Sequence, residues 1–165
     1  MTRVEWAVLD TPIGPVSVGA DDHAVRAVHL GAGGDRATRP APAPSGPLAM
    51  AVAQLREYFA GTRTVFDLPP ADPGGSDLER AVWAELTRIP YGQTRTYGQV
   101  AAAVGDAGAA RAVGTACNRN PMPLIVPCHR VVGAGGKLVG FGAGLPRKRW
   151  LLEHEARVTL EGAWA

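Results

Sequence analysis

Residues 127–131 read Pro127-Cys128-His129-Arg130-Val131, and this stretch gives more information about the fold and chemistry of the chain than any other. A thiol is a useful nucleophile only as the thiolate, which near neutral pH needs a base, a positive neighbour or hydrogen-bond donors. His129 and Arg130 follow Cys128 directly and offer the first two of these. The stretch therefore makes Cys128 a candidate nucleophile.

The residues on either side of this stretch help to decide between a nucleophilic cysteine and an inert cysteine in the core. A buried cysteine in an apolar run is ordinarily a small hydrophobe without chemistry. Here the apolar run 124–126 ends at Pro127, whose fixed φ stiffens the entry to Cys128, and a polar pair then interrupts before Val131 and Val132. Polar residues between two strand-like segments favour a functional role.

Length and composition fit one ordinary domain or two small lobes. The chain has 165 residues, 46% of them hydrophobic, and its mean hydropathy is close to zero, as in globular proteins. No apolar run is long enough for a membrane-spanning helix, and Glu5 and Asp10 lie where a signal peptide needs an uncharged stretch. We therefore expect no membrane association and a cytoplasmic location.

The cysteine and histidine counts argue against a disulfide framework or a metal site. Two cysteines, Cys117 and Cys128, are too few for either, and the four histidines show no ligand spacing. We expect no metal and no cofactor.

Basic residues are concentrated in one part of the chain, although the formal net charge is only +2. Between Arg95 and Leu152 there are eight basic residues against the single acid Asp106, an excess of seven. Such a run is most often a solvated face. Because this one also contains the candidate nucleophile, it favours contact with phosphates.

The first part of the chain predicts a small β-rich lobe, residues 1–75, that serves as scaffold. Apolar alternation and turn signals predict three strands, at residues 4–9, 15–20 and 24–30. The Gly- and Pro-rich residues 31–46 predict a flexible loop. A helix follows with apolar residues at Leu48, Val52, Leu55 and Phe59, then a stop at Gly61 and a short strand at residues 65–68.

A second lobe is predicted for residues 76–157, after the Pro- and Gly-rich stretch 69–76. Ser76 with Glu79, and Thr96 with Gln99, form capping-box patterns that predict two helix starts. A turn at residues 105–108 and an Ala-rich helix at residues 109–117 complete a pattern typical of a helix-turn-helix. Many such helix pairs bind nothing.

The remaining segments predict a wing and a last helix. Residues 124–126, 131–132 and 137–140 resemble short strands, with a glycine turn at residues 133–136. Pro146 suits the first turn of a helix that runs to about Glu155. We expect residues 158–165 to be a loose tail.

The PCHRV stretch, AARAVG at residues 109–114, Asn120-Pro121 and the downstream glycine cluster together resemble the O6-alkylguanine-DNA alkyltransferase family, from about Asp77 to Glu155. The resemblance implies an α/β (α+β) fold, with a ribonuclease H-like lobe before a mostly helical lobe bearing a winged helix-turn-helix. It implies a monomer that binds double-stranded DNA containing O6-alkylguanine and transfers the alkyl group irreversibly to its own cysteine. Some members carry a zinc in the first lobe, but before residue 76 this chain has only His23 and His29 and no cysteine.

The resemblance also implies a catalytic set. Cys128 would be the nucleophile, His129 would act through a water, and Glu155 would orient the histidine. Asn120 would hold the active segment against the recognition helix. From the residues alone, an acid near a helix end is usually exposed, and an Asn-Pro pair often marks only a turn.

For DNA, the resemblance implies that the damaged nucleotide is rotated out of the stack. Arg111 would fill the gap from the minor groove, and Tyr97 would press on the 3′ phosphate. Small residues would allow close approach of the helix. The other expected contacts are Ala109, Ala110, Gly114, Asn118 and Arg119. Without the resemblance, Arg111 is an exposed helix arginine.

The implied base pocket is formed as much by backbone as by side chains, with carbonyls of Cys128 and Val131 and the glycine-rich loop 140–144. Phe141 stands where tyrosine is frequent in relatives, and Gly142 where serine can occur. Lys148 matches a lysine near the pocket in some members. Because phenylalanine lacks the tyrosine hydroxyl, the pocket has one polar contact fewer, and the sequence does not decide whether large O6 groups are accepted.

The function predicted is therefore DNA repair by a methylated-DNA-protein-cysteine methyltransferase. Three alternatives are kept. A damage-sensing relative would lack the nucleophilic cysteine, but Cys128 is present. A helix-turn-helix regulator would need a dimer or sensor domain, and a cysteine hydrolase would turn over a small substrate.

Overall fold

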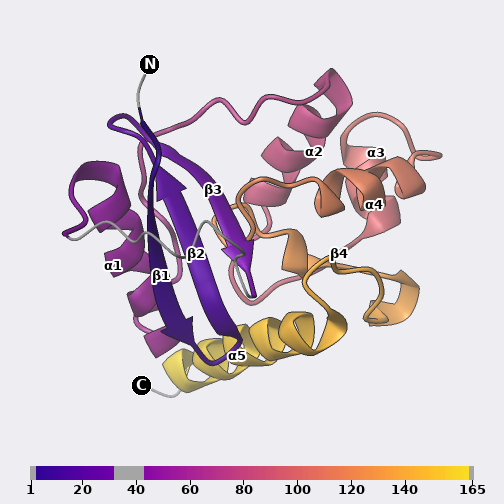
Figure 1. Cartoon of the computed structure of the whole chain (residues 1–165). Helices are drawn as coiled ribbons and strands as arrows, with labels where there is room; N and C mark the ends of the chain where they lie inside the picture. Colours follow the sequence, from indigo (N-terminus) through magenta and orange to yellow (C-terminus); the bar gives the residue numbers. More distant parts are fainter. Residues whose placement is uncertain (1–2, 32–42, 164–165) are drawn as a thin grey trace. The chain divides into compact units, whose positions relative to one another are not determined.

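The computed structural model describes residues 3–31 and 43–163 (Figure 1). The chain divides into two compact units, Met1–Pro73 and Gly74–Ala165. The flexible loop predicted at residues 31–46 falls mainly on residues 32–42, which lie outside the described residues. Within the described ranges, no helix is long and apolar enough to cross a membrane.

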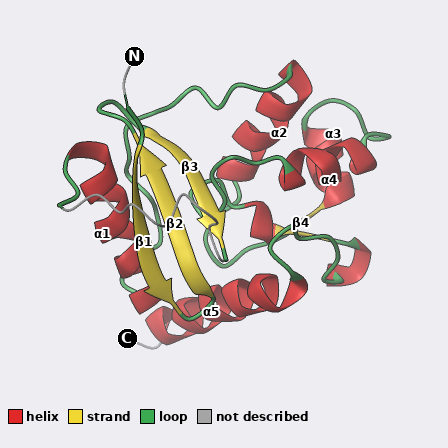
Figure 2. Cartoon of the chain, in the orientation of Figure 1, coloured by secondary structure: helices red, strands yellow, loops and turns green. Residues whose placement is uncertain are grey.

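The first unit contains a three-stranded antiparallel sheet in the order β1-β2-β3, with one helix against it (Figure 2). The strands are β1 (Glu5–Thr11), β2 (Gly14–Ala20) and β3 (Val25–Leu30), and α1 (Gly46–Ala60) packs on all three. All three predicted strands and the helix are therefore confirmed. At Gly19 a Cβ would lie 2.9 Å from the Trp6 ring, so glycine lets that ring cover the strand.

Helix α1 ends as predicted at Gly61, whose φ of 81° is left-handed and suits glycine. The strand predicted at residues 65–68 is wrong. The Gln54 side chain donates to Asp67 O and accepts from Asp67 N, both at 2.8 Å. The backbone there is thus satisfied by a side-chain amide rather than by a neighbouring strand.

The second unit is mostly helical and carries the Cys128 segment. Its helices are α2 (Asp77–Thr87), α3 (Tyr97–Ala103), α4 (Ala110–Asn118) and α5 (Leu145–Ala163), with short 3₁₀ turns at Cys128–Arg130 and Ala134–Gly136. The two-residue strands β4 (Arg95–Thr96) and β5 (Val131–Val132) pair in parallel. Both predicted capping boxes are present, at Ser76 and at Thr96.

The core of this unit joins α2, α3 and α4 to the Cys128 segment. The Trp83 indole N–H donates to Ala116 O at 2.8 Å and so ties α2 to α4. Both cysteines belong to the same buried cluster, whose members are Val82, Trp83, Leu86, Ile89, Val100, Ala101, Val113, Ala116, Cys117, Cys128 and Val131. The Cys128 segment therefore packs in the same core as α2, α3 and α4.

Two of the strands predicted around the wing are wrong. Residues 124–126 form a turn, because Leu124 has a φ of 76° and the Asn120 side chain donates to Val126 O. Residues 137–140 have no strand pairing either. The carbonyls of Val139 and Gly140 are bound by side chains instead.

The loose tail predicted from residue 158 is also wrong over residues 158–163, since α5 continues to Ala163. Its last turns are supported by local contacts. Thr159 donates to Glu155 O at 2.7 Å, and Arg157 pairs with Glu161 one turn later.

Candidate active site

Cys128 begins a 3₁₀ turn directly after Pro127, and its side chain is buried. Burial is the largest influence on its pKa and raises it. A hydrogen bond with Asn120, the positive charge of Lys148 and the Cys128 backbone N–H act in the opposite direction without cancelling it. The thiol is therefore protonated at neutral pH, and a nucleophilic role requires a base.

His129 can supply that base. It is fully buried, and burial lowers its pKa, so the imidazole is neutral. Its Nε2 lies 2.6 Å from Glu155 Oε2. Because a carboxylate only accepts, Nε2 must carry the proton, and Nδ1 keeps its lone pair. Nδ1 has no hydrogen-bond partner in the described part of the chain.

Glu155 accepts hydrogen bonds from Arg130 and Gly92 as well as from His129. Besides His129, Arg130 donates from Nε to Oε1 at 2.8 Å and from Nη2 to Oε2 at 3.2 Å. The Gly92 backbone N–H donates to Oε1 at 3.1 Å. Burial alone would raise the pKa of Glu155, but the donors and their positive charge lower it overall, so the carboxylate is ionised.

Sequence reasoning placed Arg130 beside the thiol, and the structure places it on Glu155. It also missed Gly92, which belongs to a segment that had no assigned chemistry. No local signal could have shown either contact, because Glu155 lies 25 residues from Arg130 and 63 from Gly92 in the sequence.

Asn120 organises the turn that precedes the cysteine. Its amide donates to Val126 O at 2.8 Å, and its oxygen accepts from Met122 N at 3.0 Å. Both ends of the side chain are thus used to hold the turn, and the same residue bonds the Cys128 thiol. The structure therefore links Asn120 to Cys128, and Glu155 to His129 on the next residue of the same turn.

A second set of predicted residues gathers around the backbone carbonyls of Val139 and Gly140. The Tyr97 hydroxyl donates to them at 3.2 and 3.1 Å, and Lys148 Nζ at 3.0 and 3.4 Å. Lys148 also lies over the rings of Tyr97 and Phe141, 5.6 and 5.9 Å from their centroids. Burial lowers the pKa of Lys148.

Two further predicted pocket residues lie beside these groups. Val131 is fully buried in the core cluster that contains Cys128. At Gly142, a Cβ would lie 3.8 Å from Asn118 Oδ1, so the glycine loop runs close to the end of α4.

The predicted DNA contacts lie on or beside α4. Its buried face holds Val113, Ala116 and Cys117, and Arg111 is exposed on the other side. Arg119 pairs with Glu79 at 3.7 Å while remaining largely exposed. The remaining predicted contacts are partly or fully exposed: Ala109, Ala110, Gly114 and Asn118.

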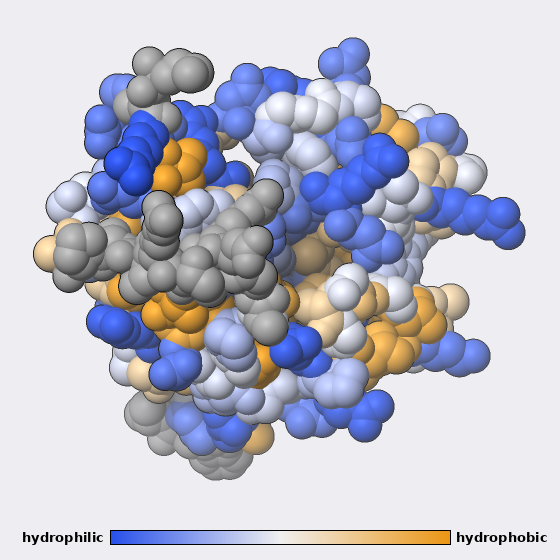
Figure 3. Space-filling view, viewed as in Figure 1, coloured by the Kyte–Doolittle hydropathy of each residue, from blue (hydrophilic) through white to orange (hydrophobic). Residues whose placement is uncertain are grey.

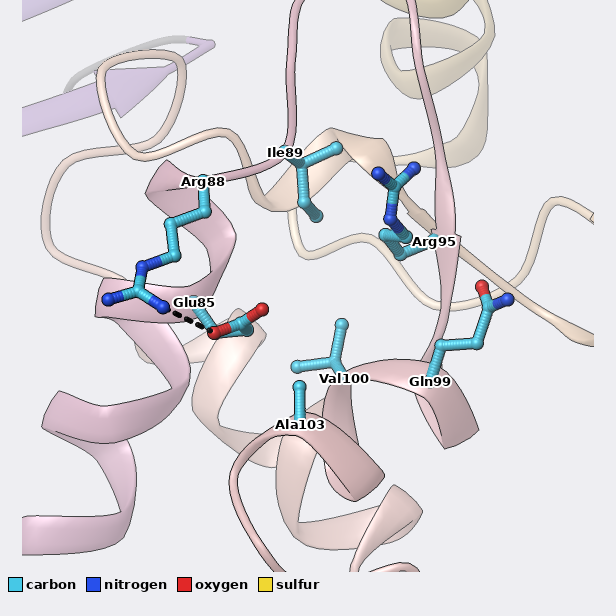
Figure 4. Close-up of a pocket in the computed structure, with 7 residues that line it drawn as sticks. All are labelled: Glu85, Arg88, Ile89, Arg95, Gln99, Val100 and Ala103. Atoms are coloured by element: carbon cyan, nitrogen blue, oxygen red, sulfur yellow. Dashed lines mark ion pairs between the residues drawn. The ribbon is translucent and has the colours of Figure 1, made fainter.

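A cavity of about 250 Å³ lies elsewhere in this unit, between the end of α2 and the start of α3 (Figure 4). Its lining consists of Glu85, Arg88, Ile89, Arg95, Gln99, Val100 and Ala103. Glu85 and Arg88 form an ion pair at 3.9 Å. None of the predicted site residues lines it.

The described surface and side chains show no metal-binding arrangement. Among the residues that the structure describes, no three His, Cys, Asp or Glu side chains are grouped so as to hold a metal ion.

Figure 3 shows hydrophobic patches separated by hydrophilic and neutral areas on the face that it presents.

Fold and site together define a two-unit protein whose helical unit carries a buried cysteine directly before a buried histidine, which is bonded to a glutamate. The model of the 6-O-methylguanine DNA methyltransferase DNA-binding domain matches residues 77–157, and that of its ribonuclease-like domain matches residues 4–71. The chain therefore belongs to the 6-O-methylguanine DNA methyltransferase family. This confirms the resemblance and the fold class inferred from the sequence.

Individual relatives agree over nearly the whole chain. A methylated-DNA-protein-cysteine methyltransferase of Mycobacterium tuberculosis is 44% identical over 92% of each chain, and one of Methanosarcina acetivorans is 42% identical over 91% of this chain and 97% of the relative. The crystal structure of the M. tuberculosis protein in complex with DNA has a TM-score of 0.84, with 44% identity over 94% of each chain.

Acid is expected to destabilise this site. The pKa values of His129 and Glu155 are both lowered on folding, so the unfolded chain binds more protons and stability falls as the pH falls. The loss should begin near 6.5, the ordinary pKa of histidine, and continue below 4.5, that of glutamate. Each unit of pKa difference is worth about 1.4 kcal/mol.

Urea midpoints measured across this pH range test the expectation. His129→Gln should remove the loss of stability that begins near pH 6.5 and leave the loss below pH 4.5. A wild-type midpoint that stays constant on acidification through both values would contradict the assignment of buried neutral His129 and buried ionised Glu155.

Proposed function

We propose that this protein repairs DNA by transferring a methyl or other alkyl group from O6 of guanine to Cys128, once per chain. The observation that carries the proposal is the network in which Glu155 fixes the His129 tautomer and leaves Nδ1 as a proton acceptor. The S–C bond forms as the C–O6 bond breaks. The thiol proton passes to His129, and the imidazolium gives a proton to the leaving guanine, so that the histidine ends neutral.

The buried thiol explains why a base is required. Because burial raises the pKa of Cys128, a neutral imidazole must take the proton as attack begins. We propose that His129 does so through a water, and that Glu155 stabilises the imidazolium that forms. Asn120 holds the segment and bonds the sulfur. No cofactor takes part in this chemistry.

DNA binding is assigned to α4 and its surroundings. Arg111 would fill the gap left by the extruded nucleotide, while the small residues would let α4 approach the minor groove. Tyr97 would contact the 3′ phosphate. Its hydroxyl would then give up its hydrogen bonds to the carbonyls of Val139 and Gly140 and donate to the phosphate. The other proposed contacts are Ala109, Ala110, Gly114, Asn118 and Arg119.

The flipped base would lie against Val131, Phe141, Gly142 and Lys148. Phe141 can cover the base without a hydroxyl, and the positive charge of Lys148 lies near its ring. In this proposal residues 1–75 act as scaffold and residues 76–157 as the DNA-binding and transferase domain. The protein would act as a monomer in the cytoplasm.

Intact-protein mass measured after incubation with duplex DNA containing O6-methylguanine tests the proposal. We expect one methyl group per chain, and peptide mapping should find it on Cys128. Turnover well beyond one equivalent would contradict a single-use mechanism. Tight binding of the damaged duplex without any mass increase would instead identify a damage sensor or a helix-turn-helix regulator.

Arg111→Ala should slow repair of duplex DNA by roughly tenfold to a hundredfold, since a side chain that replaces a stacked base is worth about 1–3 kcal/mol. Transfer from the free modified base needs no flipping and should be nearly unchanged. Thermal stability should change little, because an exposed helix arginine and alanine have similar propensities. Equal duplex rates for mutant and wild type would make Arg111 an ordinary surface residue.

A further inference from the structure

Arg130 is a buried arginine to which the mechanism above gives no role. Its guanidinium is held from three directions. Two donors bind the Glu155 carboxylate, Nη1 donates to Ile89 O at 2.8 Å, and the group lies 5.5 Å from the Tyr91 ring centroid. Arg130 is 7% exposed, so this arrangement is screened from water.

The two oxygens of Glu155 are shared between Arg130 and the other donors. Oε1 accepts from Arg130 Nε and Gly92 N, while Oε2 accepts from His129 Nε2 and Arg130 Nη2. The carboxylate therefore cannot rotate without breaking bonds on both oxygens. Arg130 donates to both oxygens and so helps to fix the orientation of the carboxylate toward His129.

The same contact controls charge. A lone buried carboxylate 2.6 Å from an imidazole would stabilise the imidazolium strongly, and a protonated His129 could not accept the thiol proton. Burial is the largest influence that keeps His129 neutral, and the positive guanidinium adds to it by offsetting the Glu155 charge, which acts in the opposite direction. The charged groups that act on His129 are Arg130 on its own turn and Glu155 and Lys148 on α5. Cys128 precedes it in the chain, and Tyr91 lies against Arg130.

We infer that Arg130 is a positioning residue for the proposed alkyl transfer, which fixes the Glu155 carboxylate and offsets its charge so that His129 remains a neutral base at physiological pH. This inference rests on the proposed function. A purely structural arginine would change stability without changing the protonation of His129.

Two variants separate these roles. Arg130→Gln removes the charge, and Arg130→Lys keeps it while losing the two-pronged contact. With Arg130→Gln, the acidic limb of the plot of transfer rate against pH should move up by about one unit or more, because an uncompensated carboxylate favours the charged imidazole. Arg130→Lys should restore the limb toward its wild-type position. Arg88→Gln, at an exposed arginine, serves as the matched control and should leave the profile unchanged.

The substrate for these rates is the free O6-methylguanine base, so that DNA binding does not enter. A folded Arg130→Gln variant whose rate is scaled equally at every pH would overturn the inference, as would an unchanged rate. Circular dichroism melting establishes which variants are folded.

A second measurement, made on the wild type and on Arg130→Gln, needs no alkyl transfer. The ring nitrogen NMR signals of His129 in the wild-type protein should show a neutral ring with the proton on Nε2 at pH 7. An imidazolium at that pH would overturn the inference. If the wild-type protein accepts no alkyl group, the proposed function fails, but the ring signals compared between the wild type and Arg130→Gln still report whether Arg130 helps to keep the histidine neutral.

Discussion

Cys128→Ala is expected to abolish alkyl transfer completely while leaving DNA binding close to that of the wild type. The substitution removes the sulfur to which the alkyl group would be attached. The phosphate contacts proposed for α4 do not involve this side chain, since Cys128 is buried and α4 presents its own exposed face. Intact mass and a binding titration with the same methylated duplex measure the two properties.

Cys117→Ala is the matched control, because this second thiol is also buried in the same core cluster. Burial raises the pKa of Cys117 to about 12, so it is not a thiolate at neutral pH. The control variant should still accept one alkyl group. Transfer to Cys117 in the Cys128→Ala protein would contradict the assignment, and loss of both transfer and binding would indicate misfolding.

The elements that the sequence predicted correctly are those determined by contacts close in the chain. Ser76 with Glu79 and Thr96 with Gln99 define helix starts within four residues, and Gly61 ends α1 because it accepts a left-handed φ. Strand alternation in the first lobe was equally local. These signals act whatever the rest of the chain does.

Two of the wrong strand predictions share a cause, which is a side chain that satisfies distant backbone groups. Gln54 takes the backbone bonds of Asp67, and Tyr97 with Lys148 takes the carbonyls at residues 139–140. In each case an apolar pattern resembled a strand, but tertiary hydrogen bonds replaced the ladder. Alternation of apolar and polar residues along a segment cannot reveal a side chain elsewhere in the chain that binds its backbone.

The site was predictable to a similar extent. The adjacency of Cys128 and His129 is written in the sequence, and the resemblance named Glu155 and Asn120. The position of Arg130 followed from neither, because adjacency to the cysteine suggested a contact with the thiol. The 3₁₀ turn directs consecutive side chains differently, and Arg130 reaches α5 instead.

Glu155→Leu is expected to lower the free energy of unfolding by about 3–5 kcal/mol at neutral pH. The substitution leaves the buried Arg130 guanidinium without its counter-charge, and removing one partner of a buried ion pair is costly in this range. His129 Nε2 and the Gly92 N–H also lose an acceptor. Urea unfolding measures the change, and Glu161→Leu, at an exposed acid on the same helix, should cost less than about 1 kcal/mol.

The double variant Glu155→Leu/Arg130→Met distinguishes a buried charge from a simple packing defect. Replacing both partners with apolar groups removes the unpaired charge, so the double variant should be more stable than Glu155→Leu alone, with a coupling of about 2 kcal/mol or more. The remaining deficit should reflect Ile89 O, which loses the Arg130 donor. Additive losses in the two single variants would show that the pair is not coupled, and that the network holding His129 does not depend on the charge of Arg130.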